Sequence, residues 1–368
     1  MIIKKINLVN YRNINNLEIL PMEKTNIIYG ENAQGKTNLV EAIWLMTGNN
    51  SFRNSKTVEL LNFDKDFFSV EIAFQDKKRE QKAKITFSEK KKILLNGVNL
   101  KTNNELKGNF YCVVFSPSHL SFVKDGPKQR RNFLDTAISQ IKPQYCSYTD
   151  TYDKLIEQRN ALLKGQTQEK KEDLLIAWDI QIAKIATIIS IYRNDYINKL
   201  NLLSKKIYSE LSSQKETFKI KYNSSCFDEN PIPTTYDKTT TEVYYKKLVE
   251  NHEYDIKQGY TTCGVHRDDL EIYINDLSVK TYGSQGQQRS SILALKLAEA
   301  ELLKLITGEN PIILLDDVMS ELDKSRQDYI LNKTSGFQVF ITCCEMCDNY
   351  KNENIKIFNM KKGSIIEE

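Results

Sequence analysis

Residues 30–37, GENAQGKT, match the pattern G-x-x-x-x-G-K-[ST], whose fixed residue types suit the binding of phosphate. Gly30 and Gly35 let the backbone wrap closely, so that its N–H groups point at phosphate oxygens beside a helix N-terminus. Lys36 is long enough to reach the β- and γ-phosphates of a nucleotide, and the Thr37 hydroxyl is a ligand for Mg²⁺. The pattern therefore predicts a site for ATP and Mg²⁺.

A second chemical element lies in PIILLDDVMSELD, residues 311–323. An apolar run before two aspartates is typical of a buried parallel strand that delivers its last side chains to the phosphate edge of a sheet. We expect Asp316 to hold Mg²⁺, directly or through water, together with Thr37. Asp317 then lies where a general base orients the attacking water.

The elements that must position these groups can be read from the flanking residues. NIIY precedes the glycine-rich loop and NLVEAIWLM follows it, which is the strand, loop and helix context that the motif requires. Asn-Gly between apolar runs predicts a hairpin within 93–100. Alternating or continuous apolar segments predict further strands at 1–9, 69–74, 269–274, 311–316 and 337–342.

Between these groups of strands the pattern is helical. Apolar residues spaced by three or four from Trp178 to Leu211 predict one long helix over about 170–213. ENPIPTT interrupts the helical region, and residues 242–258 resume it. We therefore predict an α/β head, a mixed sheet with helices, formed by residues 1–125 and 259–368 and interrupted by an α-helical insertion lobe at 126–258.

The composition bounds the class of protein. A chain of 368 residues, 40% hydrophobic and 27% charged, is typical of a globular protein with two lobes. It has neither an N-terminal leader pattern nor an uninterrupted apolar run of about 18 residues, so we predict a cytoplasmic protein without a membrane partner. Seven cysteines without framework spacing indicate reduced thiols, and we predict no metal site at the cluster Cys343, Cys344 and Cys347. The net charge of +4 permits a nucleic-acid partner without establishing one.

SQGQQRS, residues 284–290, opens an apolar helical pattern shortly before the strand that carries Asp316. This order resembles the ABC-type ATPases, whose signature serine and following backbone N–H groups bind the γ-phosphate held by the P-loop of the other subunit. SELD at 320–323 resembles their D-loop. The resemblance implies an ATP-dependent homodimer with ATP at its interface.

Further blocks narrow the resemblance. YRN at 11–13, FSPSHLSFVKDGPKQRRNFLD at 115–135 and GVHRDDL at 264–270 occur with the other motifs in the order found in the RecF family of bacterial recombination-mediator ATPases. Together the blocks span most of the chain and leave mainly the helical insertion to vary. Two departures are Val265, where the family usually has proline, and ITCCE after the last strand, which bears on Thr342 as a sensor of the γ-phosphate.

This resemblance implies a protein that binds DNA at single-strand gaps and duplex junctions, in the nucleoid-containing cytoplasm. Its two ATPase heads close on DNA when ATP is bound, and slow hydrolysis opens them. It works with RecO and RecR to help load RecA.

The residues expected to carry these roles form four sets. Those for ATP binding are Gly30, Glu31, Asn32, Ala33, Gln34, Gly35, Lys36, Thr37, Asn38, Arg12 and Gly286. Those for catalysis are Lys36 and Asp317, with Ser284 and Gln287 supplied by the other copy, and those for the metal are Thr37 and Asp316. Those for DNA are Lys77, Lys78, Lys90, Lys91 and Lys92, because lysine runs neutralise phosphates, although such runs also keep strand edges soluble.

Two polar blocks have more than one interpretation. Arg130 and Arg131 are candidates for contact with DNA, nucleotide or the opposing head. For residues 266–269, HRDD, a buried ion-pair network that holds the two lobes together is a simpler explanation than a catalytic set.

Three other classes of protein are alternatives, and the sequence fits each of them to a different degree. An SMC-type or zinc-hook ATPase needs hundreds of coiled-coil residues, and the hook version needs Cys-x-x-Cys, whereas the insertion contains only Cys146 and Cys226. An ABC transporter subunit usually has an uninterrupted core and a histidine after the last strand, where this chain has Thr342 and Cys343. A structural DNA-binding protein that holds ATP without turnover stays open, because Asp317 stands where most ABC enzymes have the longer glutamate.

Overall fold

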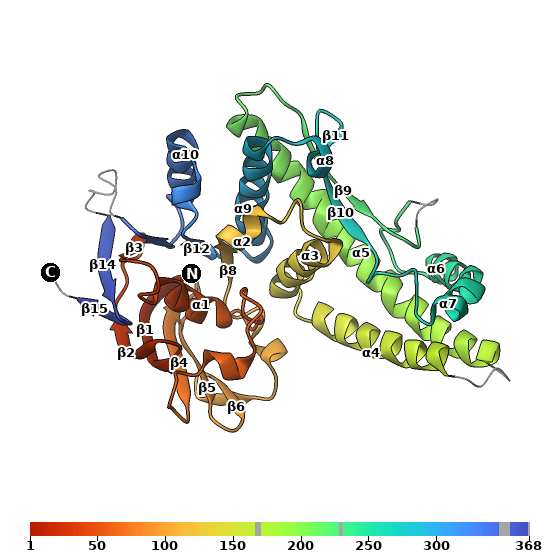
Figure 1. The fold of residues 1–368 in the computed structure, drawn as a ribbon, viewed down its shortest axis with the longest axis horizontal. Coiled ribbons are helices and arrows are strands. Elements are labelled where there is room, and N and C mark those ends of the chain that lie inside the picture. The colour runs from red at the N-terminus through yellow and green to blue at the C-terminus, as the bar shows by residue number, and fades with distance from the viewer. Residues whose placement is uncertain (166–170, 228–230, 346–353, 367–368) are drawn as a thin grey trace. The chain divides into compact units, whose positions relative to one another are not determined.

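The computed structural model describes residues 1–165, 171–227, 231–345 and 354–366, which form two compact units (Figure 1). Unit 1 comprises Met1–Ser121 and Arg289–Glu368, and unit 2 comprises Phe122–Gln288. Unit 1 is mixed α/β and unit 2 is mainly helical, so the predicted fold class, a head interrupted by a helical insertion, is confirmed.

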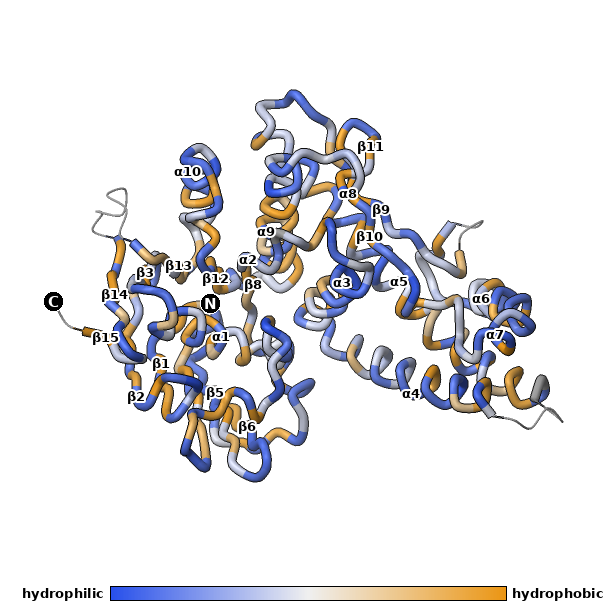
Figure 2. The backbone as a smooth tube through the Cα atoms, viewed as in Figure 1, coloured by the Kyte–Doolittle hydropathy of each residue, from blue (hydrophilic) through white to orange (hydrophobic). Residues whose placement is uncertain are grey.

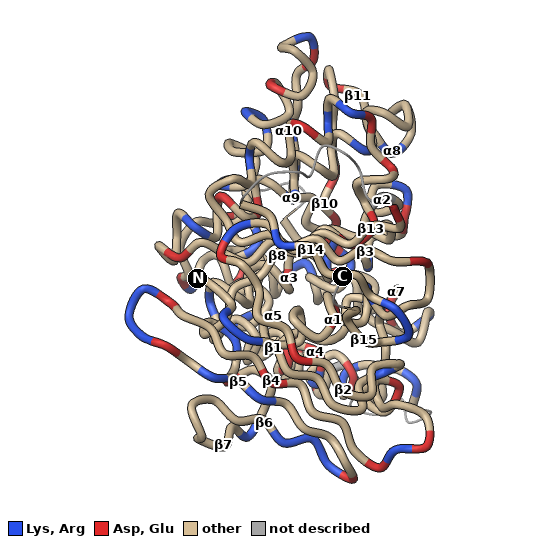
Figure 3. Tube along the Cα trace, turned by 90° about the vertical axis from the view of Figure 1, so that its left-hand side faces the viewer, with Lys and Arg blue, Asp and Glu red and all other residues tan. Residues whose placement is uncertain are grey.

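The first sheet of unit 1 is antiparallel and has the strand order β2-β1-β4-β5-β6-β7 in the described residues. Its strands are β1 (Ile2–Tyr11), β2 (Ile14–Ile19), β4 (Phe68–Gln75), β5 (Glu80–Phe87), β6 (Lys91–Leu95) and β7 (Val98–Leu100). Buried and half-exposed residues alternate along β4, as expected for a strand with one face on a core. Both signs of charge lie along its strands and turns (Figure 3).

The second sheet has the order β15-β14-β3-β13-β12-β8 and is parallel except for the β14–β15 pair. Its strands are β3 (Thr25–Tyr29), β8 (Cys112–Phe115), β12 (Ile312–Asp316), β13 (Val339–Cys343), β14 (Ile355–Lys361) and β15 (Ser364–Ile366). All residues of β8, β12 and β13 are buried, which explains why the sequences of β8 and β12 are almost wholly apolar. The carboxyl ends of β3, β12 and β13 therefore meet at one edge.

One hydrophobic core joins the two sheets and α1 (Lys36–Leu45). Apolar segments gather among these strands in Figure 2. The other helices of this unit are α2 (Pro117–Leu120), α10 (Lys324–Thr334), most of α9 (Gln285–Thr307) and the 3-10 turns η1 (Thr57–Leu60), η2 (Asn103–Leu106) and η3 (Met319–Glu321).

Unit 2 is built around the long helix α5 (Lys171–Leu211), which agrees with the predicted helix over the described residues. Its other helices are α3 (Pro127–Ile141), α4 (Tyr145–Lys164), α6 (Lys238–Glu250), α7 (His252–Gln258) and α8 (Val279–Tyr282). A small antiparallel sheet has the order β11-β10-β9, from β9 (Phe218–Asn223), β10 (Asp269–Ile274) and β11 (Leu277–Ser278).

The structure divides the chain differently from the sequence-based boundaries. The second unit extends to Gln288, whereas the predicted insertion lobe ended at 258. The reason is β9, which the sequence analysis missed and which pairs with β10 along its whole length. The helix predicted at 242–258 is also divided, because α6 ends at Glu250 and α7 begins at His252, with Asn251 as the cap residue of both.

One helix in the described residues is long and apolar enough to cross a membrane by length and composition alone, Asp173–Leu211. Asp179 within this stretch is fully buried and pairs with the fully buried Arg159 of α4. Core helices of soluble proteins pass the same test, and the contacts of α5 with α4, α6 and β9 account for its apolar face.

Candidate nucleotide-binding site

The loop between β3 and α1 depends on two glycines in the left-handed region of backbone space. Gly30 has φ 152°, and Gly35 has φ 114° at the N-cap of α1. A Cβ on Gly30 would lie 2.3 Å from the backbone oxygen of Met360, so no larger residue fits there. The tight loop leaves the N-terminal N–H groups of α1 directed into it, which is the arrangement that binds phosphate.

Lys36 lies inside this loop and is only 6% exposed. Its ammonium group donates to the backbone oxygens of Gly30, at 2.5 Å, and Glu31, at 2.8 Å. The thiol of Cys344 lies 3.7 Å from the same nitrogen. The cation is thus already held among the loop atoms that would surround a triphosphate.

Thr37 and Asp316 lie together at the edge of the sheet. The Thr37 hydroxyl donates to Asp316 Oδ1 at 2.9 Å, and the Thr342 hydroxyl donates to the same oxygen at 2.8 Å. Burial raises the pKa of Asp316, although these two hydrogen bonds oppose the shift. A buried carboxylate beside a hydroxyl presents the hard oxygen ligands that Mg²⁺ prefers, so the residues present fit this ion.

The backbone of Asp317 lies in the left-handed region, with φ 53°. Its N–H donates to the Thr342 hydroxyl at 2.9 Å, and the residue lines the open cleft described below. Thr342 therefore bonds to both aspartates, of which Asp316 is buried and Asp317 lines the cleft. These two hydrogen bonds give Thr342 a structural role besides the predicted one as a sensor of the γ-phosphate.

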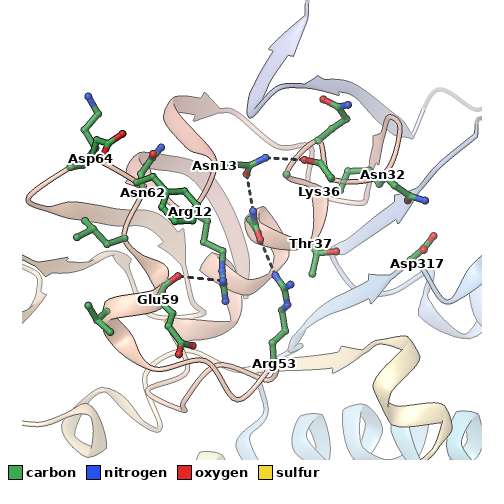
Figure 4. A pocket seen from close by; sticks show the side chains of 18 residues that line it. Arg12, Asn13, Asn32, Lys36, Thr37, Arg53, Glu59, Asn62, Asp64 and Asp317 are labelled. Atoms are coloured by element: carbon green, nitrogen blue, oxygen red, sulfur yellow. Dashed lines mark hydrogen bonds between the residues drawn. The ribbon is translucent and has the colours of Figure 1, made fainter.

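The loop opens into a cleft of about 730 Å³. Figure 4 shows a chain of side chains along it: Asn13 donates to the Ala33 oxygen at 3.0 Å, Asn38 donates to Asn13 at 2.7 Å, and Arg53 donates to Asn38 at 3.0 Å. The cleft is lined by Arg12, Asn13, Asn32, Ala33, Gln34, Gly35, Lys36, Thr37, Asn38, Arg53, Val58, Glu59, Leu61, Asn62, Phe63, Asp64, Lys65 and Asp317.

Sequence reasoning missed Asn13 and Arg53. Asn13 follows Arg12 in the YRN block, which is a usable signal. Arg53 stands in a loop with no local pattern, and only its contact with Asn38 reveals it.

Arg12 lines the cleft, but its guanidinium is committed to α1. It binds both carboxylate oxygens of Glu41, at 2.5 and 2.8 Å, and Glu41 is fully buried. Burial works against the charge of Arg12, but the bonds to Glu41 outweigh it and raise its pKa. Arg12 therefore anchors the β1–β2 strand pair to α1. The signal for its partner in the sequence was Glu41, a carboxylate inside the apolar run NLVEAIWLM.

The SQGQQ segment begins a helix, as the sequence predicts. The Ser284 hydroxyl accepts from the Gln287 N–H at 3.2 Å, and the Gln287 side chain accepts from the Ser284 N–H at 2.9 Å. This reciprocal cap fixes the first turn of α9 and leaves Ser284 exposed. Gln287 also donates to Glu216 at 2.7 Å, within unit 2.

The lysines proposed for DNA contact differ in exposure. Lys77, Lys78, Lys90 and Lys92 are exposed. Lys91 is half-buried on β6, and burial lowers its pKa, which makes it the weakest candidate of the five.

The structure contradicts the interpretation of Arg130 as a contact to DNA, nucleotide or the opposing head. Arg130 is 2% exposed, pairs with Asp269 at 2.7 Å and donates to three backbone oxygens within unit 2. This side chain is a structural link between α3 and β10 and is not available to DNA, nucleotide or another head. Arg131 is less buried and donates to the Asp268 oxygen at 2.8 Å.

The HRDD block forms a polar network in which Asp268 is buried and Arg267 is exposed, and its contacts join residues 266–269 to the predicted insertion lobe, all within unit 2 of the structure. Asp268 accepts from the Tyr222 hydroxyl and from Ser225. His266 bonds to the Tyr152 hydroxyl at 2.6 Å, and burial lowers its pKa to about 4. Val265 donates its N–H to Tyr244 at 3.0 Å, a bond that proline cannot make.

Fold and site together define an ATP-binding P-loop ATPase, with a head of the SMC type interrupted by a helical insertion. The model of the RecF/RecN/SMC N-terminal domain matches residues 2–365. An Smc head domain from Pyrococcus furiosus has the same fold, with a TM-score of 0.54 at 16% identity and coverage of 99% of this chain and 95% of that one.

More similar proteins identify the family. The DNA replication and repair protein RecF of Clostridium beijerinckii is 38% identical over 372 residues, covering 100% of this chain and 99% of the relative. That of Clostridioides difficile is 38% identical over 371 residues, covering 100% and 98%. A solved structure of the recombination mediator protein RecF with ATP, in the RecFOR pathway, has a TM-score of 0.90 at 37% identity and covers 99% of this chain and 97% of that one. The chain belongs to the RecF family.

Proposed function

We propose that this protein is an ATP-switched DNA-binding protein of DNA replication and recombinational repair. The observation that carries the proposal is the Thr37–Asp316 pair beside a glycine-rich loop, in a chain whose relatives are DNA replication and repair proteins. Two copies close on DNA at single-strand gaps and duplex junctions when each holds ATP.

The residues of the site have different roles in binding and hydrolysing ATP. Residues 30–38 donate backbone N–H groups to it, and Lys36 exchanges its two loop carbonyls for phosphate oxygens. Thr37 and Asp316 would hold Mg²⁺, which would neutralise part of the phosphate charge. Asp317, at the cleft, orients water for hydrolysis.

Slow turnover follows from the side chain at 317. An aspartate reaches one methylene less far than a glutamate, so it places the base farther from the water. ATP then works mainly as a switch for assembly, and slow hydrolysis resets it. The same observation favours a second candidate, a structural DNA-binding protein that holds ATP without turning it over.

The second copy completes each site. Ser284, Gly286 and Gln287 stand at the exposed start of α9 with uncharged donors, which suits the γ-phosphate of ATP bound by a partner copy. RecO and RecR are the proposed partners in helping to load RecA in the cytoplasm, by analogy with the RecFOR pathway named for the solved relative.

The proposal is tested by DNA affinity at a gapped duplex with ATP, ADP or no nucleotide. Wild-type protein should bind more tightly with ATP, and Lys36→Met should lose this gain, with ATP binding reduced about tenfold or more because a charge-assisted phosphate contact is removed. Lys205→Met, an exposed lysine of α5, is the control. Equal DNA affinity in all three nucleotide states would overturn the proposal. Phosphate release in the same samples separates the slow enzyme from the candidate without turnover.

A further inference from the structure

The glycine-rich loop packs against the hairpin formed by β14 and β15, whose two-residue turn is Lys362–Gly363. A Cβ on Gly30 would lie 2.3 Å from the backbone oxygen of Met360, at the end of β14. A Cβ on Gly363 would lie 2.3 Å from the backbone oxygen of Asn13, in the turn between β1 and β2. Glycine therefore lets segments of unit 1 that are far apart in the sequence approach at backbone distance.

Hydrogen bonds join the loop to both of these turns. The Lys362 N–H donates to the side-chain oxygen of Gln34 at 2.6 Å, and the Gly363 N–H donates to the backbone oxygen of Gln34 at 2.9 Å. The Asn13 side chain donates to the backbone oxygen of Ala33 at 3.0 Å (Figure 4). The carbonyl groups of two successive loop residues are therefore each held by a donor from another segment.

The direction of these carbonyl groups decides where the next N–H groups point. The described chain has no cis peptide bond, and in a planar trans peptide the C=O of one residue and the N–H of the next point in opposite directions. The Ala33 oxygen points toward Asn13, so the Gln34 N–H points away from it. The Gln34 oxygen points toward Gly363, so the Gly35 N–H points away from the hairpin. Successive N–H groups turned into one concave loop form a site for an anion.

We propose that the turn Lys362–Gly363, with Asn13, is a positioning element for the triphosphate. It aims the N–H groups of Gln34 and Gly35 at phosphate oxygens. This rests on the proposed function, in which the glycine-rich loop holds ATP. The charge of Lys36 attracts the phosphates, whereas the positioning element fixes the shape of the loop before ATP binds, so that less conformational freedom is lost on binding.

The proposal gives Gln34 a different use from the direct contact that the sequence predicts for the loop residues. Its side chain bonds to the hairpin, and only its backbone N–H meets the phosphates. The positioning element acts on phosphate alone, so ATP and inorganic tripolyphosphate, which share a chain of three phosphates, should depend on it equally.

The experiment compares Gly363→Ala with Gly97→Ala in equilibrium titrations of ATP and tripolyphosphate with Mg²⁺. Gly97 is the matched control, because it also lies in a hairpin turn at positive φ, 83° against 77°, but no atom of the described residues lies within 4 Å of a Cβ there. Both variants therefore carry similar backbone strain, and only Gly363→Ala forces its turn away from Asn13. Gly363→Ala should weaken both ligands by the same factor, about fivefold, which is the net effect of one hydrogen bond. Gly97→Ala should bind both as wild type does.

A second variant removes the other half of the positioning element. Asn13→Ala lacks the donor to the Ala33 oxygen, and because Asn13 is exposed, the fold should be kept. It should also weaken ATP and tripolyphosphate by equal factors. Should Gly363→Ala fail to fold, Asn13→Ala decides the question alone.

A spectroscopic signature separates positioning from a general loss of stability. With carbonyl-¹³C glutamine and amide-¹⁵N glycine, the Gln-Gly pairs that give a signal are Gln34–Gly35, Gln258–Gly259 and Gln285–Gly286. In nucleotide-free Gly363→Ala the Gly35 signal should be displaced from its wild-type position while the other two stay. In Gly97→Ala all of these signals should stay.

The outcomes distinguish this inference from the function on which it rests. If wild-type protein binds neither ATP nor tripolyphosphate, the proposed nucleotide site itself fails. If both ligands bind to wild type, but Gly363→Ala and Asn13→Ala leave their affinities and the Gly35 signal unchanged, only the positioning role is overturned. A loss of affinity for ATP without a loss for tripolyphosphate would also overturn it, because the effect would then lie at another part of the nucleotide.

Discussion

The Thr37 hydroxyl donates to the carboxylate of Asp316 at 2.9 Å, which joins the first turn of α1 to the end of β12 across 279 residues of sequence. Neither side chain reaches the other unless β3 and β12 are placed in one sheet, separated by β13. The pair is therefore the product of the whole parallel sheet.

Asp316→Asn should stabilise the nucleotide-free protein and disable the loaded one. Burial raises the pKa of Asp316 above its unfolded value, so the native state holds this proton more tightly. The resulting contribution to stability is present below the unfolded pKa and is lost as pH rises through the folded pKa. Near pH 7 the amide should raise the melting temperature, because it replaces a buried charge with a neutral group of similar shape.

The same substitution should weaken Mg²⁺-dependent ATP binding about tenfold or more, since a neutral amide is a poor ligand for Mg²⁺. Thermal melts with and without Mg-ATP measure both effects. A lower melting temperature together with unchanged binding of Mg-ATP would contradict the assigned role of Asp316.

The exposed lysines of the antiparallel sheet should set the salt dependence of DNA binding. Changing Lys77, Lys78, Lys90 and Lys92 to Ala should reduce the slope of log affinity against log salt, by about 0.9 for each phosphate of duplex DNA that is no longer neutralised. The matched control changes the same four lysines to Arg, which keeps the charge and should keep the slope. An unchanged slope in the Ala variant would mean that these lysines do not contact DNA phosphates and only keep a strand edge soluble.

Arg159→Met should strongly destabilise unit 2. Arg159 is fully buried and pairs with Asp179 at 2.7 Å and Asp255 at 2.6 Å, both fully buried. Removing the cation takes the arginine partner from two buried carboxylates, which keep only His252 beside Asp179 and Thr262 beside Asp255, at a cost of about 3–5 kcal/mol. Denaturant unfolding measures this, with Lys154→Met at an exposed position of the same helix as control. A change below about 1 kcal/mol would mean that other groups satisfy the two aspartates.

How much the sequence could predict depended on whether a feature was local. The glycine-rich loop, the helix start at SQGQQ and the long helix α5 are determined by residues close in sequence, and the structure has them where they were expected. The Asn-Gly turn between β6 and β7 is another case, with Asn96 and Gly97 both at positive φ.

The features that could not be predicted depend on contacts between residues that are far apart in the sequence. Arg130 looked available from its basic neighbourhood, but its environment is set by Asp269 on β10, 139 positions away. Thr342 bonds to both aspartates only because β12 and β13 pair in register. The strand β9 has an alternating pattern, but it is short and follows a long helix, and its partner β10 lies beyond two further helices.

The central claim is that two copies share each ATP, and sedimentation of the wild-type protein and of Ser284→Arg with ATP, ADP or no nucleotide tests it most directly. We expect ATP alone to convert wild-type protein to a dimer. Ser284→Arg should bind ATP within about twofold of wild type while sedimenting as a monomer, since the new side chain blocks the approach of a partner's phosphates. A wild-type protein that stays monomeric when saturated with ATP, with and without gapped DNA, would contradict the shared site.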